Sequence, residues 1–213
     1  NINNTLYVIP YYQRGYRWET QQVIDLLEDI NSFSQKPLRY EEIYCIQPLV
    51  VTQRDEDVLE KCKRPEATLA DIRSYIKGSW SVVHGQQRLT TLFLIYKYMY
   101  NSSGGFIEIP DISLEYETRK KSEEFLKEID LSLKEDNIDY WHICNAYETI
   151  EKWFSKEENK KSTLTNFNKY FDENVKVIWY EVGENEDSIA LFTRLNIGKI
   201  PLTSAELVKA MFL

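Results

Sequence analysis

The stretch Trp80–Tyr98 constrains the fold most, because a strand pattern and a helix pattern meet in it with only a few polar residues between them. Residues 80–83 are β-branched and aromatic, which predicts a buried strand. After Arg88 the apolar residues recur at helical spacing. The polar turn His84-Gly85-Gln86-Gln87-Arg88 separates the two patterns. The sequence therefore predicts a strand that passes through a tight glycine turn into a helix.

This turn combines features of an anion-binding site. The start of a helix offers unpaired backbone N–H groups and the positive end of the helix dipole. Arg88 adds a guanidinium that suits phosphate oxygens, and Gln86 and Gln87 add neutral donors and acceptors. An ordinary strand-to-helix connection with a solvated arginine explains the same residues, so the turn alone leaves both interpretations open.

A second candidate segment, residues 9–19, holds four aromatic rings, two arginines and a glycine after a proline. Loops that carry such residues often bind ligands. In one interpretation the segment forms a wall of a nucleotide or nucleic-acid pocket, with rings for stacking and Arg14 for phosphate. In the other, Tyr11, Tyr16 and Trp18 pack on the following helix and the arginines are solvated.

Periodicity predicts further elements on both sides of the central stretch. Strands are expected over residues 6–9, 43–52, 112–116 and 176–182. Helices are expected over residues 20–33, 66–76, 119–129, 138–154, 162–171, 187–195 and 204–213. Pro48 restricts the second strand to an edge or a bulged position, because proline donates no backbone hydrogen bond.

The overall charge excludes one mode of DNA binding. A formal net charge of −8 and a pI of about 5.0 do not allow the chain to coat DNA by bulk charge, although a local basic groove stays open. No apolar run reaches the length of a membrane span, so no membrane partner is expected.

The number and spacing of the cysteines and histidines limit which metal or disulfide sites the chain can form. Cys45, Cys62 and Cys144 are far apart and form no Cys-x-x-Cys pair, which argues against a zinc site or a disulfide framework and fits a reducing cytoplasm. The only histidines, His84 and His142, cannot by themselves supply a histidine-rich metallonuclease centre.

The third informative segment is residues 192–203, which contains Asn196, Gly198 and Lys199. Gly198-Lys199 is not a Walker A motif, because the upstream glycine and the following Ser or Thr are missing. Helix C-capping also explains Asn196 and Gly198. The chain stops within an apolar helical pattern at residues 211–213, so we expect a fragment of a longer protein.

Taken together, residues 9–18, 84–92 and 192–203 resemble, in this order and spacing, the N-terminal domain of GmrSD-type modification-dependent restriction endonucleases. The resemblance spans essentially the whole chain. Its most specific part is Gly-Gln-Gln-Arg followed by Leu-Thr-Thr-Leu. The segment with Tyr-Gln-Arg is nearly as specific, and the Asn-Gly segment carries less weight alone.

The resemblance implies an α+β fold of the ParB/sulfiredoxin-like type, with a small mixed sheet and a helical extension. Residues 1–105 would form the nucleotide-binding core. Residues 106–213 would form a mostly helical extension with one or two strands, which returns the Asn-Gly segment to the site.

The resemblance also implies a function. Relatives hydrolyse nucleoside triphosphates and couple this to cutting DNA with modified bases or a modified backbone. In many of them the cutting domain is a separate C-terminal HNH-type nuclease, which this chain lacks. The expected role is therefore nucleoside triphosphate binding with magnesium, and hydrolysis, in a bacterial restriction or phage-defence system of the cytoplasm. Nucleotide, modified DNA and a nuclease domain are the expected partners, and a homodimer stays open.

The residues that the resemblance assigns to nucleotide and phosphate binding are Gln13, Arg14, Tyr16, Trp18, Gly85, Gln86, Gln87, Arg88, Thr90, Asn196 and Lys199. Catalysis would involve His84, Gln87 and Arg88. The family pattern has an aspartate where this chain has His84. A carboxylate there holds magnesium or orients water better than an imidazole does, so phosphate binding is expected more firmly than hydrolysis, and no metal ligand is expected from the protein.

Two alternatives stay open at this point. In the first, the chain is a DNA-reading module without catalysis, and residues 11–18 contact DNA, including a flipped or modified base. In the second, the chain is a degenerate structural domain.

Overall fold

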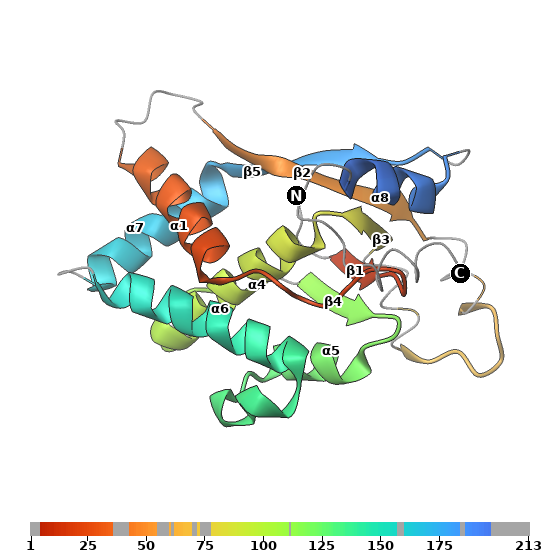
Figure 1. Cartoon of the computed structure of the whole chain (residues 1–213), viewed down its shortest axis with the longest axis horizontal. Coiled ribbons are helices and arrows are strands. Elements are labelled where there is room, and N and C mark those ends of the chain that lie inside the picture. Colours follow the sequence, from red (N-terminus) through yellow and green to blue (C-terminus); the bar gives the residue numbers. More distant parts are fainter. Residues whose placement is uncertain are drawn as a thin grey trace.

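A computed structural model of the chain describes residues 5–35, 43–54, 60, 62–69, 72, 78–110, 112–156, 160–183 and 186–196. Five strands form one sheet in the order β4-β1-β3-β2-β5, with helices packed around it (Figure 1). The strands are β1 (Thr5–Ile9), β2 (Tyr44–Gln53), β3 (Ser79–His84), β4 (Ile112–Tyr116) and β5 (Val175–Glu181). The described helices are α1 (Thr20–Ser34), α4 (Gln86–Ser102), α5 (Lys120–Lys127), the 3-10 helix η1 (Leu131–Asp136), α6 (Ile138–Ser155), α7 (Lys160–Glu173) and α8 (Ser188–Asn196). The expected α+β class is confirmed.

The sheet is mostly parallel, and this aligns three strand ends. Strand β1 runs parallel to both β3 and β4, while β2 is antiparallel to β3 and parallel to β5. The carboxyl ends of β1, β3 and β4 therefore lie at one edge, where open α/β sheets commonly bind ligands. Strands β4 and β5, both from beyond residue 105, take the two ends of the sheet.

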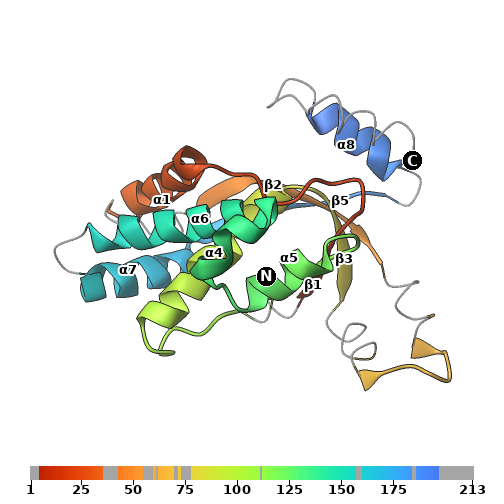
Figure 2. The same cartoon turned by 60° about the horizontal axis from the view of Figure 1, so that its bottom comes forward.

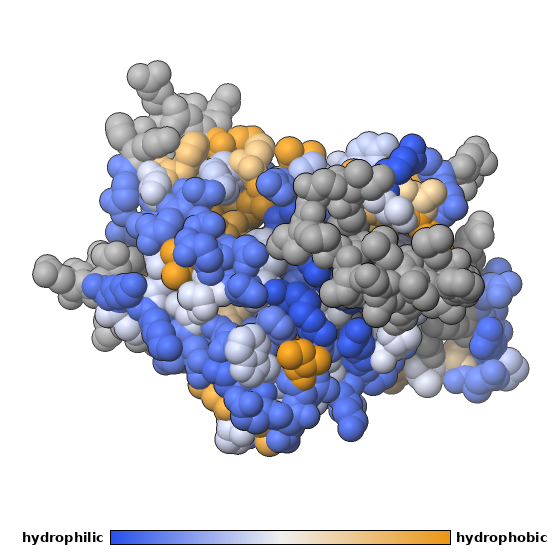
Figure 3. Space-filling view, in the orientation of Figure 1, coloured by the Kyte–Doolittle hydropathy of each residue, from blue (hydrophilic) through white to orange (hydrophobic). Residues whose placement is uncertain are grey.

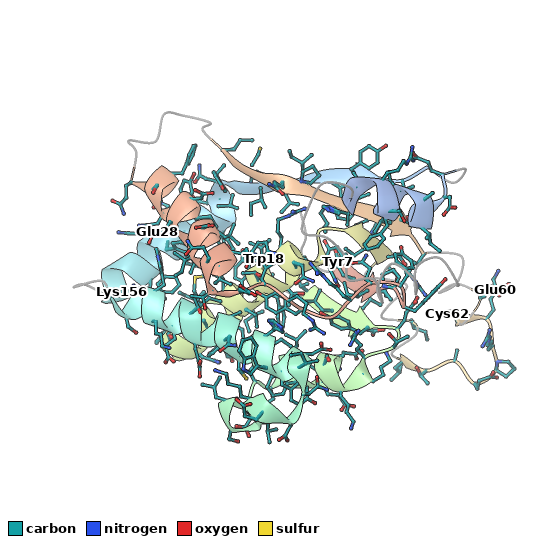
Figure 4. The ribbon with its side chains drawn as sticks, in the orientation of Figure 1. Tyr7, Trp18, Glu28, Glu60, Cys62 and Lys156 are labelled. Carbon is teal, nitrogen blue, oxygen red and sulfur yellow. The ribbon has the colours of Figure 1, made fainter. Side chains whose placement is uncertain are left out.

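The main core lies between one face of the sheet and helices α1, α4, α6 and α7. Helix α4 is central to it and is buried on most sides, which explains why most positions from Leu89 to Tyr100 are apolar or aromatic. Tyr7 and Val82 point into this core from β1 and β3. Tyr7 is fully buried, while Trp18 is partly buried and packs against the core (both labelled in Figure 4).

Helix α8 lies on the opposite face of the sheet, apart from the other helices (Figure 2). A second, smaller apolar cluster holds it there, formed by Val50, Val83, Val182 and Phe192. Tyr12 packs against this cluster, with its ring centroid 5.4 Å from that of Phe192. The segment that follows β1 and the C-terminal helix are thereby brought to the same end of β3.

Most predicted elements are confirmed to within two residues, and two details differ. Helix α4 begins at Gln86 rather than after Arg88, so Arg88 belongs to its first turn. Strand β2 is an interior strand, and the irregularity expected at Pro48 appears as a register shift between Ile46 and Leu49. Most of the helix expected over residues 66–76, and all of that over 204–213, lies outside the described residues. Within the described ranges, no helix has the length and apolar character needed to cross a membrane.

Candidate functional site

The turn between β3 and α4 requires glycine. Gly85 has φ 101° and ψ 6°, a left-handed conformation that residues with a side chain rarely adopt. A Cβ atom there would lie 3.1 Å from the Arg88 Nη2 atom, the Leu49 Cδ1 atom and the Pro48 carbonyl oxygen. The N-cap residue Gly85 has no side chain to cap this end of α4, and no bond from a described side chain to the backbone N–H groups of its first turn is seen, which leaves these groups to an anion.

Gln86 and Gln87 attach the turn to the N-terminal loop, as we call residues 10–19 between β1 and α1. Gln86 Nε2 donates to the Arg14 carbonyl at 2.6 Å, and Gln87 Nε2 donates to the Gly15 carbonyl at 3.0 Å. Gln87 Oε1 accepts from the Arg17 backbone N–H at 2.7 Å. The two predicted segments are therefore joined by direct hydrogen bonds.

Three further predicted binding residues lie inside the fold, as Gln86 does. Gln13 is buried, and its amide nitrogen donates to the carbonyl oxygens of Val82 and Val83 in β3. Tyr16 is buried, and its hydroxyl bonds the Thr91 hydroxyl at 2.8 Å. Thr90 is buried as well, in contact with the Tyr116 hydroxyl. These contacts hold the N-terminal loop and β4 against β3 and α4.

Arg88 extends away from the N-terminal loop, toward β2. Its Nη1 donates to the Gln47 side-chain oxygen at 2.9 Å and its Nη2 to the Pro48 carbonyl at 2.5 Å. Both acceptors are neutral, and no described carboxylate pairs with the guanidinium. Burial lowers the pKa of Arg88, so its positive charge is partly desolvated, and no described residue supplies a counter-ion.

The space beside Arg88 is small. A cavity of about 10 Å³, lined by Gly85, Arg88 and Leu89 of the turn and Leu49 of β2, is about the size of one water molecule. A phosphate bound by Arg88 and the first turn of α4 would therefore lie on the outer side of the turn rather than in this cavity.

Arg14 and His84 border the same turn. The Arg14 side chain is half-buried and has no ion pair or hydrogen bond with any part of the chain that the structure describes. His84 is the last residue of β3, is half-buried and pairs in register with Val50. Arg14 thus supplies a second guanidinium in the loop that Gln86 fixes.

A buried carboxylate, Asp139, anchors the N-terminal loop and was not found from the sequence. Its Oδ1 lies 2.6 Å from Arg17 Nη1, and its Oδ2 lies 3.1 Å from Arg119 Nη1 and accepts from the Ser122 hydroxyl at 2.8 Å. Burial alone would raise the pKa of Asp139, but these bonds and charges bring it below its usual value. An acidic residue in the first turn of a helix is common, so the sequence carried no signal for this role.

Two further predicted residues lie at or beyond the end of the described chain. Asn196 is the last residue of α8, a helix that packs through Phe192 on the side of the sheet where Val83 points. Lys199 lies outside the described residues. Within the described part of the chain, no three His, Cys, Asp or Glu residues gather in a way that suits a metal ion.

Comparison with known families gives one match over the whole chain. The profile of the family described as "GmrSD restriction endonuclease, N-terminal domain" matches residues 1–213. No curated protein is similar enough to count as a match.

Proposed function

The chain belongs to the family of GmrSD restriction endonuclease N-terminal domains, and from this membership we propose that it is the nucleotide-binding domain of a restriction system that defends against phage. The ParB/sulfiredoxin-like type of fold is part of this proposal. The mixed sheet and the glycine turn at the start of α4 support it.

The observation that carries the proposal is the burial of the Arg88 guanidinium and its choice of hydrogen-bond partners. Among the described residues, the partly desolvated guanidinium is bonded only to neutral oxygens, and such a group favours an incoming anion because the anion restores electrostatic balance. The uncapped first turn of α4 adds backbone donors at the same point. Phosphate is the anion that this combination suits best.

In this proposal the first turn of α4 and Arg88 bind phosphate oxygens, and Arg14 approaches from the N-terminal loop. Gln86 and Gln87 keep that loop in place through its backbone, so their main part is to position Arg14. Magnesium would come with the phosphates. Because His84 stands where the family pattern has aspartate, this position supplies no carboxylate ligand for the magnesium ion. We therefore propose nucleotide binding more firmly than nucleotide hydrolysis.

A restriction system also needs a nuclease and a DNA target. With His84 and His142 as its only histidines, this chain is unsuited to cut DNA as a histidine-rich metallonuclease. We therefore propose that it works with a nuclease domain outside these residues, and that nucleotide binding controls the access of that nuclease to modified DNA.

The test is calorimetric titration of the chain with ATP, GTP and CTP, each with magnesium. Saturable binding of at least one nucleotide is expected. Arg88→Ala should weaken it by about 10- to 100-fold, since a hydrogen bond to a charged group contributes about 1.5–3 kcal/mol. Arg64→Ala is the matched control, because Arg64 is exposed and lies outside the site.

Three results contradict the proposal. They are the absence of binding for all three nucleotides, unchanged affinity in Arg88→Ala, and an equal loss in Arg64→Ala. If nucleotides fail but modified DNA binds with steep salt dependence, the DNA-reading alternative is favoured instead. Thermal unfolding of each variant distinguishes a lost site from a lost fold.

A further inference from the structure

The two outer strands of the sheet, β4 and β5, differ in how far other parts of the chain cover their outer edges. At the β4 edge, the Ile112 N–H donates to the Pro110 carbonyl at 2.7 Å and the Tyr116 N–H donates to the Glu123 carboxylate at 3.3 Å. Helix α5, which carries Glu123, packs against β4. The chain itself therefore covers this edge at Ile112 and Tyr116, in the way that edge strands are commonly protected.

The β5 edge has no comparable cover among the described residues. Strand β5 ends the sheet, and three large side chains in a row are exposed: Ile178 by 48%, Trp179 by 39% and Tyr180 by 49%. Figure 3 shows apolar side chains along the upper rim of the molecule, over β2 and β5. An exposed apolar edge strand pairs readily with another strand.

The outer side of β5 presents backbone N–H and carbonyl groups for which no described residue supplies a hydrogen-bond partner. The Val182 N–H donates to the Val51 carbonyl, and the Asn174 carbonyl accepts from the Tyr44 N–H, so even-numbered residues face β2. Since backbone groups alternate along a strand, the N–H and carbonyl groups of Val175, Val177, Trp179 and Glu181 face outward.

We propose that β5 is a homodimer interface, in which β5 of a second copy pairs antiparallel with it about a two-fold axis through Ile178. This register places Val175 opposite Glu181 of the second copy, and Val177 opposite Trp179 of the second copy. Each of these is a pair of outward-facing residues, so every outward group of both strands is hydrogen-bonded. The two five-stranded sheets become one continuous sheet.

The side chains are complementary in this register. On one face Ile178 meets Ile178 of the second copy, and Lys176 meets the ring of Tyr180 of the second copy, which suits a cation–π contact. On the other face Val177 meets Trp179 of the second copy. No like charges are opposed. The strand is therefore self-complementary, as a two-fold interface requires.

The first experiment is sedimentation of the chain over the micromolar concentration range. A dimer that dissociates on dilution is expected for the natural sequence, and a monomer is expected for Ile178→Lys. Phe106→Lys is the matched control, because Phe106 is 92% exposed and lies outside the sheet, in the connection between α4 and β4; this variant should remain a dimer. A monomeric natural chain, or a dimer that survives Ile178→Lys, overturns the proposal.

A second experiment tests the register. Opposed residues that are not hydrogen-bonded have Cα atoms about 4.5 Å apart, which lies within the range for a disulfide. Ile178→Cys, with the accessible Cys45 and Cys62 changed to serine, should form a covalent dimer under mild oxidation. Trp179→Cys in the same background should not form a covalent dimer. In the proposed register Trp179 lies opposite Val177 of the second copy, so the two cysteines at position 179 are not opposite each other. Cross-linking at 179 and not at 178 overturns the proposed pairing.

Discussion

Asp139 and Arg17 form an ion pair of 2.6 Å between residues 122 positions apart in the sequence. The carboxylate is almost completely buried, with 2% of its side chain exposed, and the guanidinium is 23% exposed. The pair fixes the second half of the N-terminal loop to the start of α6. Gln86 and Gln87 fix the middle of the loop, from Arg14 to Arg17, to α4, so the loop is held from two sides.

Asp139→Asn is expected to lower the free energy of unfolding by about 3 kcal/mol. The substitution keeps the shape of the side chain but leaves two guanidinium groups, of Arg17 and Arg119, without their anion. Urea unfolding followed by tryptophan fluorescence measures the change. Asp136→Asn, at an exposed position on η1, is the control, and equal midpoints for the two variants would contradict the anchoring role.

The ionisation of the Asp139 carboxylate makes the free energy of unfolding depend on pH. The pKa of Asp139 in the folded chain lies below the usual value of 3.8, so its stabilising effect is present above about pH 4 and is lost as the pH falls through the folded pKa. The difference in unfolding free energy between the natural chain and Asp139→Asn should therefore be constant from about pH 7 to 5 and narrow toward pH 3. A constant difference throughout would refute this assignment.

Gly15→Ala should destabilise the chain by about 1–3 kcal/mol. A Cβ atom at Gly15 would lie 2.3 Å from Asp139 Oδ1, so either the loop or the carboxylate must move. Gly183→Ala is the matched comparison, because a Cβ atom there meets nothing within 4 Å. The thermal midpoints of the two variants test this, and the prediction fails if Gly15→Ala melts no lower than Gly183→Ala.

His84→Asp should make nucleotide binding more dependent on magnesium. A carboxylate at the end of β3 offers the hard oxygen ligand that the family pattern provides at this position. Titrations in magnesium and in EDTA give the ratio of affinities, which should rise in His84→Asp and stay unchanged in His84→Asn. The same ratio in both variants would mean that this position does not face the bound metal.

Much of the local structure was predictable because it follows from the order of apolar residues. Helix α6 was predicted from the helical spacing of its buried residues, and β4 from its alternation. The start of α4 was placed too late because Gln86 and Gln87 look like loop residues. Their polar side chains serve the N-terminal loop while their backbone is already helical.

The sheet order and the Asp139 anchor could not be read from the sequence. The ladder that joins β1 to β4 connects residues more than a hundred positions apart, and periodicity identifies a strand without identifying its neighbour. For the candidate site, the sequence indicated Gly85 correctly as the turn residue. It could not indicate that Gln13 and Tyr16 are buried, because polar and aromatic side chains suit a pocket wall and a packed loop equally well.

The long-range ladders of this sheet have a consequence for synthesis on the ribosome. Strand β1 needs β4, and the N-terminal loop needs Asp139, yet both partners emerge long after the residues that they hold. Folding that depends on such distant contacts is slow to begin. The loop around Arg14 should therefore acquire its final geometry only after α6 has left the exit tunnel, so the candidate site is completed late in synthesis.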